Sequence, residues 1–123
     1  MKTNKMNVVG WIMTVVPSLL FVFSAVMKLS QKPEVVEGFA KFGIPAGLIV
    51  PLGILELVCT IVYLIPATTV IGAILLTGYI GGAIITHVRI GDSVMLHVAI
   101  GIVIWGGAFL RDSRLRNLIP IRR

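Results

Sequence analysis

The sequence predicts an all-α, membrane-embedded protein: an antiparallel four-helix bundle with a short amphipathic helix in its first outer loop. Its 123 residues are 57% hydrophobic and only 13% charged, whereas a soluble domain carries about 25% charged residues. The apolar residues also gather in four long runs, and a bilayer core needs roughly 20 apolar residues per helix. Together these observations exclude a disordered tail, a coiled coil and an ordinary soluble enzyme.

The first run is longer than the roughly 7–15 apolar residues of a signal-peptide core, so we expect it to be a span. Trp11 should anchor it at the interface, and Pro17 should kink it. The four spans nearly exhaust the chain, which predicts one transmembrane domain over residues 1–123. Their expected bounds are 8–28, 46–65, 67–88 and 93–110.

The first outer loop contains a helix signal of its own. Pro33 and Glu34 are typical of a helix start, and apolar residues then recur at helical spacing until Gly43 and Pro45. Residues 33–42 are therefore predicted to form a short amphipathic helix. This helix either lies in the outer interface or packs on the bundle as a loop helix.

A tight helical hairpin is expected between the second and third spans. Pro66 interrupts an apolar stretch of about 40 residues, and Thr68 or Thr69 should cap the start of the third span. In that span Gly78 and Gly82 form a GxxxG pair, which lets helices approach closely. We expect the pair to pack within the bundle or, alternatively, to form the face of a homodimer.

Basic residues set the expected orientation. Seven flank one side of the spans and four flank the other, so the positive-inside rule favours both termini in the cytoplasm. The net charge of +6 indicates contact with a lipid surface rather than nucleic acid, because the basic residues border apolar spans. The seven are Lys2, Lys5, Arg111, Arg114, Arg116, Arg122 and Arg123; the four are Lys28, Lys32, Lys41 and Arg89.

Glu56 is the one formal charge near the middle of a span. A charge there costs about 2.5–3.5 kcal/mol, so this carboxyl should be protonated, paired or turned toward a wet cavity. In the expected orientation Lys28, His87 and His97 lie in the outer half of the bundle on the other three helices. If the four faces converge, they form an ionisable pocket that opens toward the outer surface.

Three more polar residues complete the candidate ligand-binding set: Ser24, one turn before Lys28, together with Tyr79 and Arg89. Each member also has a purely structural explanation. A lysine reaches the interface, a histidine caps its own helix or joins two helices, and a carboxylate pairs with a neighbouring cation.

Several chemistries are compatible with these residue types. Glu56, His87 and His97 are suitable metal ligands, but no HxxxH or ExxH spacing places two of them on one helix, so no metal is expected. A haem site would lack the CxxCH motif. An amphipathic ligand such as a quinone suits the composition better, because Tyr79, His87 or Arg89 would bond its oxygens while the spans contact its ring and tail.

The single cysteine, Cys59, cannot form an internal disulfide or a CxxC pair. Thiol redox chemistry would therefore require a partner protein. The sequence assigns no catalytic residue, and it leaves open whether the protein is an enzyme.

The chain resembles the DoxX-like family of small bacterial membrane proteins over nearly its whole length. The resemblance implies a four-helix membrane protein, with Lys28, Glu56, His87 and Arg89 at the family's polar positions. Named relatives are linked to quinone-coupled thiosulfate oxidation and to membrane redox complexes. Ala25 departs from the pattern, since a glycine is common there. The segments that carry the resemblance are 23–29 (FSAVMKL), 42–45 (FGIP), 53–57 (GILEL), 81–89 (GGAIITHVR) and Arg111-Asp112.

We therefore expect a component of a quinone- or redox-linked membrane process that works with other membrane or redox proteins. The alternative is a small-ligand or lipid-binding membrane protein, or a membrane chaperone, with no redox activity. A third alternative is a structural partner whose glycine-rich face docks another protein.

Overall fold

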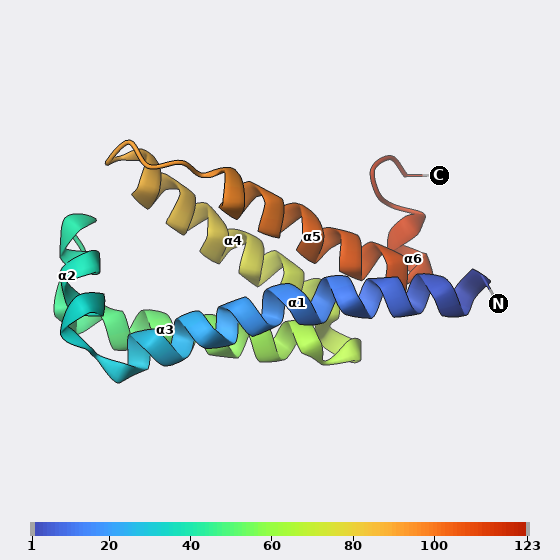
Figure 1. Cartoon of the computed structure of the whole chain (residues 1–123). Coiled ribbons are helices and arrows are strands. Elements are labelled where there is room, and N and C mark those ends of the chain that lie inside the picture. Colours follow the sequence, from blue (N-terminus) through green and yellow to red (C-terminus); the bar gives the residue numbers. More distant parts are fainter. Residues whose placement is uncertain (1, 123) are drawn as a thin grey trace.

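The computed structural model describes residues 2–122, and these residues are all-helical, which confirms the all-α class (Figure 1). Arg123, which the sequence groups with the basic C-terminal tail, lies outside the described residues. The long helices are α1 (Lys2–Ser30), α3 (Ala46–Leu64), α4 (Thr69–Val88) and α5 (Met95–Arg111). The short ones are α2 (Pro33–Lys41), the 3-10 helix η1 (Pro66–Thr68) and α6 (Ser113–Arg116).

The four long helices pack in a ring. α1 lies against α3 and α5, and α4 closes the ring by packing on the same two helices. Both chain ends lie at one end of the molecule, and α2 lies at the other end (Figure 1). There α4 and α5 diverge from α1 and α3.

Three helical segments are long and apolar enough to cross a membrane: Lys5–Ser30, Ala46–Leu64 and Pro66–Val88. The fourth, Met95–Arg111, is apolar but shorter. Large apolar side chains cover the outside of these helices; Phe23, for example, is 66% exposed and Ile102 is 68% exposed. Soluble monomers rarely leave so extensive an apolar surface uncovered, whereas lipid-facing helices do.

The hairpin between α3 and α4 forms at Pro66, as predicted, but its threonines act differently. The Thr68 hydroxyl donates to the Val62 carbonyl at 2.7 Å, and the Thr69 hydroxyl donates to the Tyr63 carbonyl at 3.1 Å. They therefore satisfy carbonyls at the end of α3, and no side chain caps the start of α4. The capping prediction is wrong, because both hydroxyls bond carbonyls at the end of α3 instead.

The closest helix contacts occur at glycines other than the GxxxG pair. A Cβ atom on Gly72 of α4 would overlap the backbone of Tyr63 in α3, and one on Gly107 of α5 would lie 3.1 Å from the Gly10 carbonyl of α1. Around Gly78 and Gly82 nothing lies within 4 Å of such an atom. Close packing within the bundle therefore uses Gly72, Gly107 and Gly10 rather than Gly78 and Gly82, and the expectation that the GxxxG pair packs there is wrong.

The end of the bundle that holds the termini is closed by a polar network. Tyr63 is fully buried, and its hydroxyl donates to the Ile104 carbonyl at 2.6 Å. The Arg111 guanidinium lies 4.2 Å from the centre of the Trp11 ring and donates to the Thr69 hydroxyl at 3.3 Å. With this end filled, open space within the bundle lies toward the end that holds α2.

Candidate ligand-binding site

An ion pair joins the first two long helices at the α2 end. The Nζ atom of Lys28 donates to Oε1 of Glu56 at 2.8 Å and to Oγ of Ser24 at 2.6 Å. Ser24 and Lys28 are one turn apart on α1, so both face the same neighbour. Gly53 makes the approach of α3 to this face possible, because a Cβ atom there would lie 3.0 Å from Cβ of Lys28.

The pair is almost entirely removed from solvent. The side chain of Lys28 is 9% exposed and that of Glu56 is 3% exposed. The ammonium also lies 5.7 Å from the centre of the Phe39 ring and 5.8 Å from that of Tyr79, within the range of a cation–π contact. Glu56 is therefore paired, which was one of the three states expected of a carboxyl inside a span.

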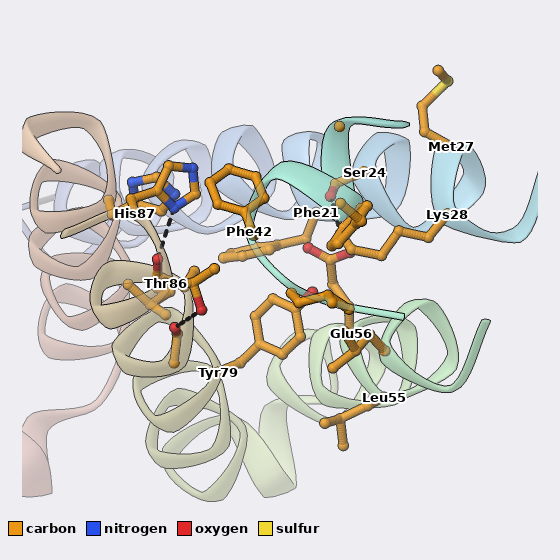
Figure 2. Close-up of a pocket in the computed structure, with 18 of the residues that line it drawn as sticks. Phe21, Ser24, Met27, Lys28, Phe42, Leu55, Glu56, Tyr79, Thr86 and His87 are labelled. Atoms are coloured by element: carbon orange, nitrogen blue, oxygen red, sulfur yellow. Dashed lines mark hydrogen bonds and ion pairs between the residues drawn. The ribbon is translucent and has the colours of Figure 1, made fainter. Parts of the chain in front are cut away.

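The ion pair lines a cavity of about 780 Å³, and all four long helices and α2 contribute residues to its wall. Figure 2 shows Glu56 and Lys28 on one side of it, His87 on the other, and Phe42 and Tyr79 between them. Most of the wall is apolar or aromatic, and a few polar groups interrupt it. Pockets that bind small molecules have this composition and volumes of roughly 300–1,000 Å³.

Two histidines meet at the second polar side of the cavity. The rings of His87 in α4 and His97 in α5 have centroids 4.4 Å apart, and the Phe42 ring lies 4.7 Å from that of His87. Nδ1 of His87 is 2.7 Å from the Ala83 carbonyl oxygen, so this histidine does bond its own helix. His87 nevertheless lines the cavity as well.

The structure brings most of the predicted site residues together. The residues of this set that line the cavity are Ser24, Lys28, Glu56, Tyr79, His87 and His97. Arg89 does not line it; this residue is exposed at the end of α4, with its guanidinium directed toward Gly43. Within residues 2–122 no three His, Cys, Asp or Glu side chains gather as a metal site would require.

Nothing in the sequence marks the aromatic residues of α2 as part of the site. Phe39 and Phe42 are half-buried, and both line the cavity. Their helical spacing marked the apolar face of α2 but left open whether lipid or the bundle would cover it. In the structure α2 contacts α3, and its aromatic residues line the cavity. The position of α2 relative to a lipid interface stays a prediction.

These features define a class: a small helical membrane protein with an ion pair buried beside an apolar cavity. The chain belongs to the DoxX-like family, whose sequence profile matches residues 12–109. The resemblance drawn from the motifs is thereby confirmed. No curated protein and no solved structure gives a significant match to this chain.

Proposed function

We propose that this DoxX-like protein is a four-span protein of the bacterial inner membrane that binds a quinone-like ligand in its cavity. Four antiparallel spans put both termini in the cytoplasm and open a polar pocket toward the outer surface. This orientation is supported by the excess of basic residues at the two tails and by the position of both chain ends at one end of the molecule (Figure 1).

The observation that carries the proposal is that the cavity combines apolar walls with polar groups at two places. Its walls suit an apolar ring and the start of an isoprenoid tail, while the ion pair and two histidines offer hydrogen bonds at two separate places (Figure 2). A buried ion pair is a costly way to stabilise a fold, because desolvation offsets most of the attraction between the charges. Hydrogen bonding to a bound molecule would explain why the chain buries this pair.

The chain alone does not supply an electron carrier in this proposal. Cys59 is buried, and it is the one cysteine of the chain. Electron transfer to or from the ligand therefore needs a second membrane or redox protein. We propose that this protein provides the quinone site of such an assembly, rather than its redox centre.

A lipid-binding role is the second candidate, and the composition of the walls favours it. Most of the cavity is lined by apolar side chains such as Leu20, Leu52 and Leu55, which suit an acyl chain as well as an isoprenoid tail. In that case the ion pair would bind a polar headgroup.

Identification of the molecules that co-purify in mild detergent tests the two candidates. We expect organic extracts of the wild-type protein to contain quinone in stoichiometric amounts. Extracts of Glu56→Gln should contain at least tenfold less, although this variant keeps the volume and one acceptor oxygen of the carboxylate. A phospholipid or sterol in place of quinone would contradict the proposal. Arg89→Gln is the matched control, because Arg89 does not line the cavity.

A further inference from the structure

The protonation of His87 follows from its one hydrogen bond. A backbone carbonyl oxygen only accepts, so the 2.7 Å contact between Nδ1 and the Ala83 oxygen requires the proton on Nδ1. In the neutral imidazole the other ring nitrogen, Nε2, is then a bare acceptor. Among residues 2–122 no group donates a hydrogen bond to Nε2.

His97 has the complementary arrangement. Its Nδ1 atom is buried and has no partner among the described residues. Orphaned N–H groups are rarer in proteins than under-satisfied acceptors, which favours placing the proton of this ring on Nε2. The two neighbouring histidines thus offer one acceptor and one donor, and both residues line the cavity.

The ion pair on the other side of the cavity has acceptor capacity to spare. A carboxylate offers about four lone-pair positions. The contact with Lys28 Nζ fills one of those on Glu56, and the hydroxyls of Ser24 and Tyr79 lie close enough to interact with two more, which leaves one for a ligand. Lys28 has three N–H groups, of which Ser24 and Glu56 take two. This side therefore also accepts and donates at one place.

Each polar side of the cavity thus presents both hydrogen-bond donors and acceptors. A hydroxyl group can bond to both kinds, whereas a carbonyl oxygen can bond only to the donors. From this pattern we infer that the cavity binds a ring carrying two hydroxyl groups, the reduced quinol form of its ligand, more tightly than the oxidised quinone. One O–H donates to Nε2 of His87 and the other to the carboxylate of Glu56. The inference rests on the proposed function and adds to it the redox state that the site selects.

The preference has a measurable size. Each additional hydrogen bond on binding corresponds to an affinity ratio of about tenfold, so the two O–H donors together correspond to about a hundredfold. Tighter binding of the reduced form raises the midpoint potential of the bound couple, by about 30 mV for each tenfold ratio in a two-electron reaction. The bound quinol is therefore a weaker reductant than free quinol.

Equilibrium binding of the two redox forms tests the inference. The probes are a decyl-substituted benzoquinone and its chemically reduced quinol, kept under argon at pH 8, where imidazole is neutral. The solubilised full chain is titrated with each probe, and empty micelles serve as the partition blank. We expect the quinol to bind about a hundredfold more tightly, and this comparison needs no variant.

Two variants locate the effect. His87→Phe keeps a flat ring between Phe42 and His97 but removes Nε2; it should lower quinol affinity about tenfold, because the bond to Glu56 remains, and leave quinone affinity unchanged. Arg89→Gln should retain the wild-type ratio. Equal affinities in the wild-type protein, or tighter quinone binding, would overturn the redox preference while the proposed quinone site stands. If neither probe binds, the proposed function itself fails.

Discussion

The ammonium nitrogen of Lys28 lies 2.8 Å from a carboxylate oxygen of Glu56, and both side chains are buried. The residues are 28 positions apart and come from different helices. This contact neutralises the acidic group that an apolar span would otherwise exclude. It also fixes α1 against α3 beside the cavity.

A double-mutant cycle measures how strongly the pair is coupled. Removing one partner leaves an isolated buried charge, so Lys28→Met or Glu56→Leu should each lower the free energy of unfolding by about 3 kcal/mol. The double variant replaces both charges by apolar groups and should recover most of that loss. Unfolding by SDS in mixed micelles supplies the three values. Strictly additive losses would show that the two charges do not stabilise each other.

Whether a buried residue could be predicted depended on whether it interrupts the apolar pattern. Glu56 and Lys28 stand out against apolar spans, and their similar depth suggested the contact before any geometry was known. Phe39 and Phe42 do not stand out, because an aromatic residue suits lipid and a cavity wall equally well. Nothing in α4 indicated that Gly72, rather than Gly78, meets a neighbouring helix.

The reason is the uniformity of the spans. When nearly every face of a helix is apolar, hydropathy gives its length but not its rotation, since burial in protein and burial in lipid select the same side chains. The contacts of a charged residue, Arg111, were not predictable either. Its position at the end of α5 predicted a cation that orients the chain, and its contacts with Trp11 and Thr69 come from packing that the sequence does not encode locally.

Two glycines of α4 should respond oppositely to the same substitution. At Gly72 the added methyl group would overlap the backbone of Tyr63, which cannot move without separating α3 from α4. Gly72→Ala should therefore destabilise the protein by more than about 3 kcal/mol, in the range of severe core defects. Thermal unfolding in detergent, followed by circular dichroism, measures the change.

Gly81→Ala is the matched control for that measurement. Gly81 lies on the same helix, does not line the cavity and has nothing within 4 Å of the added atom. The substitution should be neutral or stabilising by up to about 1 kcal/mol, because alanine favours the helix. A large loss of stability at Gly81 together with tolerance at Gly72 would contradict the packing of α3 on α4.

Arg111 and Arg114 should differ although both belong to the basic C-terminal segment. Arg111 stacks on Trp11 and donates to the Thr69 hydroxyl, so Arg111→Ala should cost about 2 kcal/mol through lost cation–π and hydrogen-bond contacts. The side chain of Arg114 is 91% exposed, and Arg114→Ala should change stability by less than about 0.5 kcal/mol. Equal effects in an SDS titration would show that the stacking on Trp11 does not stabilise the fold.

The proposed orientation predicts which cysteines a membrane-impermeant maleimide reaches in intact cells. In a Cys59→Ala background, Gln31→Cys places a thiol in the loop before α2, and Asn117→Cys places one after α6; both positions are exposed. With the tails in the cytoplasm, the first thiol should be labelled in intact cells and the second only after permeabilisation. The two sites lie at opposite ends of the bundle (Figure 1), so each controls for the other. The reverse pattern would put the cavity on the cytoplasmic side and overturn the outward opening. Basic residues at the two tails should keep the tails on the inner side of the membrane. Labelling of both sites in intact cells would therefore mean that the chain does not span the bilayer in one orientation.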